Sequence, residues 1–211
     1  MSFIDSLDRQ ARIAICIPAR DQMHTATSYD LWNLAQHLSA SHIQSKLFVS
    51  PGTLIANQRH ELVLAAKEWG ATHVMFIDSD ITFPPTSVTA LLEQDELIVG
   101  AAYSKRAPPF ITTAWYSIGD WDTWVRTNEV DEALVQVDCM ALGFCLIKMG
   151  VFDEIDQPWF QLGFFNGQYT GEDIEFFRKV KEANIPVWLD IEVTRSLGHL
   201  GTHAFTVVRD N

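Results

Sequence analysis

The sequence predicts an α/β fold in which a parallel or mixed sheet is flanked by helices and carries a small antiparallel portion in its middle. The first ~80 residues alternate between short apolar runs and segments of helical spacing, as in a parallel sheet with crossover helices. Residues 103–133 hold three tryptophans and have no long helical period. A helical segment and another apolar run follow over 172–193, so the α/β pattern then resumes.

The first half of the chain contains four short, nearly continuous apolar runs, which are typical of buried parallel strands. These runs are residues 12–17, 46–49, 73–77 and 97–102. Apolar residues at helical spacing predict helices over 25–40 and 54–69. We expect Thr53 to cap the second helix and Gly70 to end it, because each residue type is favoured at that position. A short helix is expected to begin at Pro84.

The second half is less regular. Residues 103–133 are rich in turn residues and predict short antiparallel strands and loops. The apolar run 135–147 predicts one strand that bends at Gly143. Beyond it we expect a mobile loop over 157–171, a helix over 172–183 and a last strand over 187–193.

Length and composition predict one globular domain over residues 1–211. The chain has 27 acidic and 15 basic residues and a net charge of −12, which disfavours a protein that coats nucleic acid. No apolar run reaches the ~18–20 residues of a membrane span, and the N-terminus lacks the pattern of a signal peptide. Cys16, Cys139 and Cys145 lie in apolar runs, so we expect reduced core residues and a cytoplasmic protein. A disulfide between Cys139 and Cys145 is the alternative.

Two acids follow the third predicted strand in the segment Asp78-Ser79-Asp80. Ligands of open α/β sheets bind beyond the carboxyl ends of strands. Side chains two residues apart point the same way in extended chain, so the two carboxylates would repel each other unless a cation lies between them. The sequence therefore predicts either a site for Mg²⁺ or Mn²⁺ or, because Asp and Ser favour turns, a simple turn.

Two helices present charged residues on their apolar stripes. Arg59 lies four residues after Ile55 and three before Leu62, so it needs a buried anion unless it extends to the surface. We expect that anion to be Asp78, Asp80 or a phosphate. In the helix that begins at Glu172, Asp173 shares a face with Phe176, Phe177 and Val180. It either lines a cleft or is an N-cap or first-turn acid that the helix dipole favours.

A histidine stands between glycines in the segment Gly198-His199-Leu200-Gly201. The flanking glycines leave room for close approach, so His199 is a candidate metal ligand. The alternative is an ordinary polar surface residue near the end of the chain.

In combination, these features resemble the nucleotide-sugar-dependent glycosyltransferases of the GT-A fold, with similarity to their large family 2 and to its compact microbial or phage-type members. Asp78-Ser79-Asp80 resembles the Asp-x-Asp motif of this group, and Gly171-Glu172-Asp173 resembles its Glu-Asp motif. The Gly-His segment resembles its late metal-binding histidine. The order of the three motifs carries the resemblance, which covers roughly residues 12–201 and is weak over 104–132.

The resemblance implies an enzyme that transfers a sugar from a nucleoside-diphosphate sugar, most readily a UDP-sugar, to an acceptor hydroxyl. Residues 12–102 would form the nucleotide-binding half, 103–201 the sugar and acceptor half, and 202–211 a tail. The acceptor is left open among glycans, small molecules and modified nucleobases. The protein would act in the cytoplasm, or in the host cytoplasm if a phage encodes it.

Roles for the acids and the histidine are also implied. Asp80 and His199 would bind Mn²⁺ or Mg²⁺, and Asp78 would hold the ribose or, indirectly, the metal. Asp173, next to Glu172 in the catalytic motif, would be the base of an inverting reaction, although a retaining enzyme can carry similar motifs.

Further donor contacts are implied elsewhere. Pro18, Ala19 and Arg20 would lie where the first strand meets the nucleotide base. Ser79 belongs to the Asp-x-Asp segment. Arg59, with Asn57 nearby, would face the nucleotide or brace Asp78.

The sugar would be bordered by Gly143 and Phe144. Trp159 and Phe160 would either stack on the acceptor or pack in the core.

Two other functions fit part of the sequence. Asp78-Ser79-Asp80-Ile81-Thr82 also resembles the Asp-x-Asp-x-Thr motif of haloacid-dehalogenase-like phosphatases, in which the first aspartate is a nucleophile. That family places its motif on the first strand, whereas here strand and helix units precede it. The other alternative is a nucleotide-sugar-binding module without turnover, which retention of all the acids disfavours.

Overall fold

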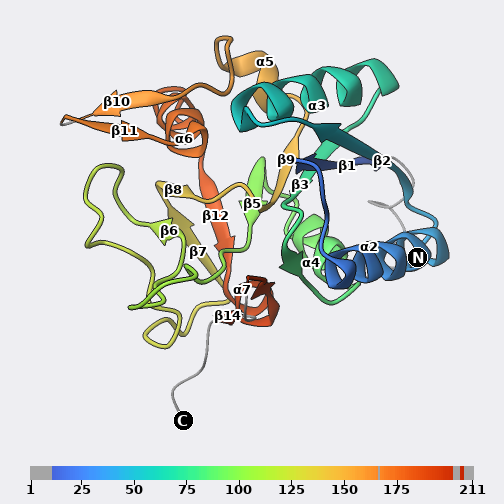
Figure 1. Cartoon of the computed structure of the whole chain (residues 1–211), viewed down its shortest axis with the longest axis horizontal. Helices are drawn as coiled ribbons and strands as arrows, with labels where there is room; N and C mark the ends of the chain where they lie inside the picture. Colours follow the sequence, from blue (N-terminus) through green and yellow to red (C-terminus); the bar gives the residue numbers. More distant parts are fainter. Residues whose placement is uncertain (1–10, 166, 202–204, 207–211) are drawn as a thin grey trace.

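The computed structural model describes residues 11–165, 167–201 and 205–206 and is built around a mixed seven-stranded sheet (Figure 1). The strand order is β2-β1-β3-β9-β5-β12-β7. In that order the strands span Gln44–Pro51, Arg12–Ala19, His73–Ile77, Phe144–Lys148, Ile98–Gly100, Val187–Asp190 and Leu134–Val137. Strands β2, β1, β3, β5 and β12 run parallel to one another, and β9 and β7 run antiparallel to them. The predicted α/β class with a mixed sheet is therefore confirmed.

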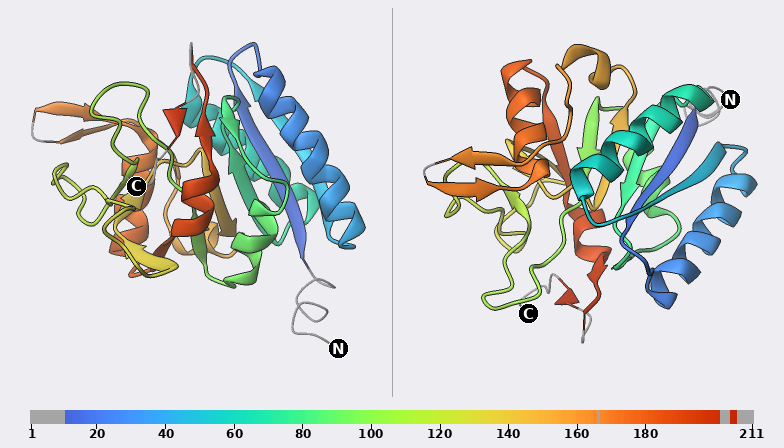
Figure 2. Two further views of the ribbon diagram at one scale, coloured as in Figure 1. Left: turned by 90° about the horizontal axis from the view of Figure 1, so that it is seen from below. Right: turned by 45° about the horizontal axis from the view of Figure 1, so that its top comes forward.

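Helices cover both faces of this sheet, and each face has its own apolar core (Figures 1 and 2). One core includes residues of α3 (Ile55–Trp69), α5 (Val151–Glu154) and α6 (Glu172–Glu182). The other includes residues of α2 (Thr25–Ala40) and α4 (Ser87–Glu93), with α7 (Ile191–Ser196) beside α4. The sheet is thus the middle of three layers.

The first half follows its sequence pattern closely. The predicted strands and helices of residues 12–102 are present, although α4 begins at Ser87 and not at the expected Pro84. Gly70 ends α3 in the left-handed conformation with a φ of 75°. The predicted cap at Thr53 is wrong. Helix α3 begins after Leu54, whose side chain makes no capping hydrogen bond.

Three predictions for the second half need correction. The run 135–147 is three strands instead of one: β7, β8 (Cys139–Met140) and β9 have different partners. Residues 157–171 contain an antiparallel hairpin of β10 (Gly163–Phe165) and β11 (Gln168–Thr170) instead of only a loop. The last strand stops at Asp190, because the Oδ1 atom of Asp190 accepts a hydrogen bond from the Val193 amide at 2.9 Å and thereby caps α7.

The small antiparallel portion in the middle is confirmed, since β6 (Ala114–Trp115) pairs with β8. The hairpin β10–β11 lies beside this portion at the end of the molecule remote from α2 (Figures 1 and 2). Loops and short strands therefore gather at one end of the sheet.

A three-stranded ribbon joins the C-terminal part to the centre of the sheet. Strand β13 (Gly198–His199) pairs with both β4 (Ile81–Thr82) and β14 (Phe205–Thr206). Because β4 begins directly after Asp80, this pairing brings two motifs together that are more than a hundred residues apart in sequence. The rest of the predicted tail, 202–204 and 207–211, lies outside the described residues.

All three cysteines are free and buried, so the expectation of core thiols is confirmed and the alternative Cys139–Cys145 disulfide is not formed. Burial raises the pKa of the Cys139 thiol to about 12. Among the described residues, no helix is both long and apolar enough to cross a membrane.

Candidate active site

The candidate site lies at the edge of the sheet where the parallel strands β1, β3 and β5 end. Asp78 follows β3 directly, and Tyr103 comes shortly after β5. The antiparallel strand β9 begins at this edge, and the Gly143 carbonyl accepts a hydrogen bond from the Asp78 amide at 2.9 Å. The topology therefore places the predicted Asp-x-Asp segment and the predicted glycine side by side.

Both oxygens of the Asp78 carboxylate have a protein donor. Oδ1 accepts a hydrogen bond from the Arg59 guanidinium at 2.9 Å, and Oδ2 accepts one from the Tyr103 hydroxyl at 3.1 Å. A Cβ atom on Gly143 would come within 2.3 Å of Oδ2 and 2.5 Å of the Tyr103 hydroxyl. The glycine thus makes room for this hydrogen-bonded pair.

Arg59 is the centre of a buried ionic network. Its side chain is 2% exposed, and besides Asp78 it donates to the Glu172 carboxylate at 3.1 Å and to the Leu142 carbonyl at 3.4 Å. Although burial opposes the charge, the carboxylates of Asp78 and Glu172 together raise the pKa of the Arg59 guanidinium. The predicted inward position is confirmed. Of the three anions considered, Asp78 is the partner that the structure provides, and Glu172 is a second one that sequence reasoning missed.

Asp80 points away from this network and toward His199. Nε2 of His199 lies 3.7 Å from Oδ2 of Asp80, and Nδ1 lies 2.8 Å from the Ser104 carbonyl. Because a carbonyl only accepts, Nδ1 carries the proton there. Nε2 therefore faces the carboxylate with a lone pair when the histidine is neutral and with an N–H group when it is protonated. Burial favours the neutral form of Asp80, but the hydrogen bond and charge of protonated His199, with the charges of Arg106 and His24, lower the pKa of its carboxyl.

This pair fits a divalent cation that takes its other ligands from a bound diphosphate and water. Mg²⁺ is commonly held in this way by one or two carboxylates plus substrate phosphates, and imidazole nitrogen is an accepted ligand of transition metals such as Mn²⁺. Within the described part of the chain, no group of three or more His, Cys, Asp and Glu side chains could hold a metal alone. Arg106 donates to Oδ2 of Asp80 at 2.9 Å and to the Leu200 carbonyl at 3.0 Å, so a cation at Asp80 would replace a guanidinium there.

Asp78 and Asp80 have different protein partners, and a cation shared by the two stays a prediction. Arg59 neutralises Asp78, while Asp80 turns toward His199 and Arg106. The chain leaves the extended conformation after β3, because Asp78 and Ile81 form a turn with a hydrogen bond from the Ile81 amide to the Asp78 carbonyl at 3.3 Å. The turn that we considered as an alternative is therefore present together with the Asp80–His199 pair.

Asp173 faces the network from the first turn of α6. Its Oδ1 atom accepts a hydrogen bond from the Ile174 amide at 2.8 Å. The N-cap of the helix is Gly171, so Asp173 is not the N-cap, but it is a first-turn acid, as the other alternative held. Burial raises the pKa of Asp173 from 3.8 to about 6, and the Glu172 charge acts in the same direction, partly offset by the Ile174 amide and Arg59. A carboxylate with this pKa can accept a proton near neutral pH.

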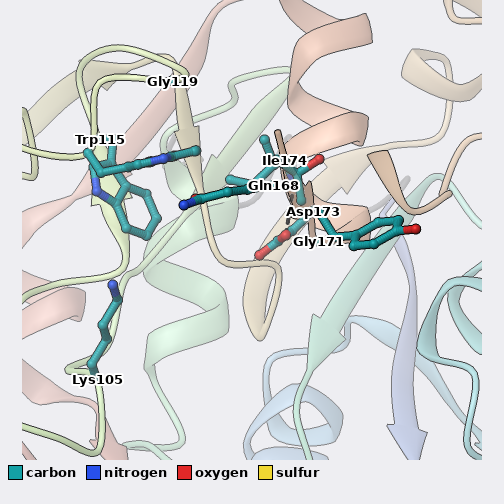
Figure 3. A pocket seen from close by; sticks show the side chains of 10 residues that line it. Lys105, Trp115, Gly119, Gln168, Gly171, Asp173 and Ile174 are labelled. Carbon is teal, nitrogen blue, oxygen red and sulfur yellow. Dashed lines mark hydrogen bonds between the residues drawn. The ribbon is translucent and has the colours of Figure 1, made fainter. Parts of the chain in front are cut away.

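Asp173 also lines a pocket of about 330 Å³ (Figure 3). The other lining residues come from the 103–133 segment, from the hairpin and from the start of α6: Lys105, Trp115, Gly119, Trp121, Gln168, Tyr169, Thr170, Gly171 and Ile174. Figure 3 shows Lys105 and Trp115 on one side of the pocket and Asp173 on the other. The pocket therefore joins the irregular end of the molecule to the charged network.

Several predicted site residues lie outside this group. Asn57 is exposed and donates to Glu61 at 2.9 Å, so its side chain hydrogen-bonds outside the network around Asp78. Phe144 is fully buried against Phe83, so its side chain cannot border a sugar. The physical reason is that β9 alternates its side chains between the two faces of a covered sheet, and Phe144 points into the α2–α4 core.

Trp159 and Phe160 are also core residues. Both are buried, and the Trp159 indole donates to the Phe152 carbonyl at 3.0 Å. Acceptor stacking by these two rings is therefore excluded, and core packing, the other interpretation, is confirmed. The aromatic side chains that line the pocket are instead Trp115, Trp121 and Tyr169.

The remaining predicted positions lie at the same sheet edge. Pro18 and Ala19 are buried at the end of β1, and Arg20 is exposed beyond it. The Ala19 carbonyl accepts from the Gln58 side chain at 2.8 Å, and the Ser79 carbonyl accepts from the His24 amide at 3.0 Å. These contacts fix the backbone around the site.

Sequence reasoning missed Tyr103 and assigned no role at the metal position to Arg106. One signal could have found Tyr103, because it follows the fourth apolar run just as Asp78 follows the third, and parallel strands end at a common edge. Arg106 lies in a segment without periodicity, and no local pattern points from it to Asp80.

No protein-family model matches the sequence, and a search of curated proteins finds no relative. Solved structures do match. The A197 protein from STIV is 16% identical and superposes with a TM-score of 0.61 over 94% of this chain and 92% of its own. A mutant of Drosophila β-1,4-galactosyltransferase 7, in complex with manganese, UDP-Gal and xylobiose, is 12% identical, with a TM-score of 0.53 over 90% of this chain and 71% of its own.

A third match is glucosyl-3-phosphoglycerate synthase from Mycobacterium tuberculosis in complex with Mg²⁺ and UDP. It is 15% identical, with a TM-score of 0.42 over 74% of this chain and 63% of its own. At these identities the likeness concerns the fold. The chain has a mixed α/β, GT-A-like fold.

Proposed function

We propose that the protein is a metal-dependent glycosyltransferase that moves a sugar from a nucleoside-diphosphate sugar, with UDP-sugars as first candidates, to an acceptor hydroxyl. The observation that carries this proposal is the arrangement at one sheet edge of a GT-A-like fold. The Asp80–His199 pair is oriented for a cation, and Asp173, an acid with a raised pKa, faces the same network. A galactosyltransferase with manganese and UDP-Gal shares the fold, which supports this choice.

Asp80 and His199 would hold Mn²⁺ or Mg²⁺ through a carboxylate oxygen and Nε2. When bound, the metal supplies positive charge to the leaving diphosphate. The Ser104 carbonyl fixes the imidazole tautomer, as outer partners of metal ligands do. The Arg106 guanidinium would leave Asp80 on metal binding and remain close enough to contact the diphosphate.

Asp78 is assigned a positioning role. Arg59 and Tyr103 fix its carboxylate, and its side chain is still 22% exposed, which leaves access for a ribose hydroxyl. The same arginine holds Glu172, the residue before Asp173. The Arg59 guanidinium thus contacts both Asp78, on the side proposed to bind the donor, and α6, the helix that carries the proposed base.

Asp173 would act as the general base. Its carboxylate accepts the proton of the acceptor hydroxyl while the hydroxyl oxygen attacks the anomeric carbon, and the bond from that carbon to the diphosphate oxygen breaks. Direct attack inverts the configuration at the anomeric carbon. In this scheme residues 12–102 bind the nucleotide and 103–201 bind the sugar and acceptor, within one domain. We place the reaction in the cytoplasm, on the support of the three free thiols.

The phosphatase alternative receives no support from the geometry. A nucleophilic aspartate needs a free oxygen, whereas both oxygens of Asp78 are hydrogen-bonded to buried donors. Asp78 also follows the third strand of the chain, with two strand and helix units before it.

Thermal unfolding in MnCl₂ with a panel of nucleoside-diphosphate sugars tests the function. A donor present at 100 times its Kd should stabilise the fold by about 2.7 kcal/mol. Stabilisation by one nucleotide series, with release of the nucleoside diphosphate on incubation, supports the proposal. If phosphate monoesters stabilise the protein and are hydrolysed while no nucleotide sugar has an effect, a phosphatase is indicated instead.

A further inference from the structure

The pocket beside Asp173 has no role in the proposed binding of the nucleotide-sugar donor. Its lining residues come from the 103–133 segment, from β11 and from the start of α6. At about 330 Å³ it lies in the range of sites for small molecules, which is about 300–1,000 Å³. The metal pair Asp80–His199 lies outside its lining, so this space is separate from the cation position.

Aromatic rings form one wall of the pocket. The rings of Trp115 and Trp121 are 5.5 Å apart at 80° to each other, and Trp121 is 39% exposed. The amine of Lys105 lies 5.5 Å from the centre of the Trp115 ring. Indole faces carry negative charge density, so they attract cations and the weakly positive C–H groups of a saturated ring.

Polar groups surround these rings. Lys105, Gln168 and Thr170 line the same pocket as the Asp173 carboxylate. Among the described residues, no carboxylate forms an ion pair with Lys105, so its amine can donate to a ligand. A flat aromatic face with several hydrogen-bonding groups around it suits a ligand with C–H surfaces and many hydroxyls, whereas a lipid chain would leave these polar groups unpaired.

A nucleic acid fits this surface poorly. A polyanion needs several free cations near the pocket, but Arg195 is paired with Glu192, and the proposed function assigns Arg106 to Asp80 or to the diphosphate. Arg126 lies over Trp124 and within 4.0 Å of Glu129. The chain also carries a net charge of −12.

We propose that this pocket is the acceptor site and that the acceptor is a carbohydrate. Its ring lies against the exposed indole of Trp121, which Trp115 contacts at 80° from the core side. Its nucleophilic hydroxyl meets Asp173, and Lys105 donates to oxygens at the end remote from the base. The inference rests on the proposed transferase function and adds the class of its second substrate. Tyr169 of the hairpin is 82% exposed and would also contact the acceptor. The Thr170 hydroxyl donates to Glu175 at 3.1 Å and so holds the hairpin against α6.

Ligand-observed NMR and calorimetry with a panel of disaccharides test the proposal, with UDP and Mn²⁺ titrated separately. The panel contains pentose, hexose, N-acetylhexosamine and uronic-acid disaccharides at millimolar concentration, and a short single-stranded oligonucleotide. The variants are W121A, W121F and, as a matched control, W32A. Trp32 is 63% exposed on α2 and does not line the pocket.

We expect at least one disaccharide to bind, with affinity about tenfold weaker in W121A, largely retained in W121F and unchanged in W32A. UDP affinity should be the same in all three variants. Binding of no disaccharide while UDP and Mn²⁺ bind normally overturns the carbohydrate assignment alone, as does an equal loss in W121A and W32A. Oligonucleotide binding that W121A abolishes assigns the pocket to nucleic acid instead. If UDP does not bind, the other nucleoside diphosphates replace it in the titration, and failure of all of them to bind contradicts the transferase function, and the acceptor site with it.

Discussion

The two sides of the site are built in different ways. The donor side stands on regular elements: Asp78 and Asp80 follow β3, Arg59 lies in the middle of α3, and His199 is fixed by strand pairing. The acceptor side stands on the 103–133 segment and the β10–β11 hairpin, where strands are two or three residues long. Arg59, which holds Asp78, is buried, whereas Trp121 and Tyr169 of the acceptor side are exposed. Under the proposed function, regular elements would hold the diphosphate, and short strands and loops would contact the acceptor.

Asp173 lies where the donor side and the acceptor side meet. Its substitution tests its proposed role as general base and should have the largest effect of the variants considered. D173N should lower turnover by roughly 10²–10⁴-fold, because the amide cannot accept the proton. UDP affinity should hardly change, since the asparagine keeps the shape of the side chain. Steady-state kinetics with calorimetry of UDP measure both quantities. D153N, at an exposed acid on α5, is the control and should keep full activity.

The pH dependence sharpens this assignment. In wild type, turnover should rise with pH through about 6 and fall below it, because the base must be ionised. Stability has the opposite sign, since a raised pKa in the folded state makes the ionised carboxylate unfavourable. D173N should therefore be more stable than wild type above pH 6, and the difference should vanish toward pH 4. A pH profile that is the same in D173N and wild type would contradict the assignment.

Removal of Arg59 tests whether the donor side depends on its ion network. R59A leaves the carboxylates of Asp78 and Glu172 without their cation, so it should lower the free energy of unfolding by about 3–5 kcal/mol. R106A is the control, because Arg106 pairs with the other aspartate of the motif but is half exposed, and should cost about 1 kcal/mol or less. Urea unfolding at pH 7 distinguishes the two. Equal losses would mean that burial of Arg59 has no energetic consequence.

Substitution of Gly143 should have a smaller effect on stability, and that effect should arise at the donor side. In G143A the new methyl group would collide with Asp78 and Tyr103, both of which are held in place, so about 1–3 kcal/mol of stability should be lost. UDP affinity should fall with it. G150A is the matched control, since a Cβ there meets nothing within 4 Å. If G143A binds UDP and unfolds like wild type, the close approach has no role in shaping the site.

The same division explains what the sequence could predict. Periodicity located β1, β3, α3 and α6, and helical spacing placed Arg59 inward, because buried regular elements leave a strong apolar pattern. The sequence pattern alone did not show that Asp78 and Asp80 have different partners. The directions of their side chains depend on a turn after β3 and on contacts with Gly143 and His199, which are distant from them in sequence. The pattern also left acceptor stacking and core packing open for Trp159 and Phe160, because neighbouring aromatic residues occur both in cores and in pockets. Nothing local indicated that Trp115 and Trp121 would meet β11.

Calorimetry of UDP with Mn²⁺ on wild type and D80N tests whether Asp80 and His199 form a cation site for a nucleoside diphosphate. We expect wild type to bind UDP with Mn²⁺ and to lose this binding in EDTA. D80N, which folds normally because Asp80 lies at the surface of the site, should bind at least tenfold more weakly. UDP binding of equal strength in EDTA, or in D80N, would contradict the claim.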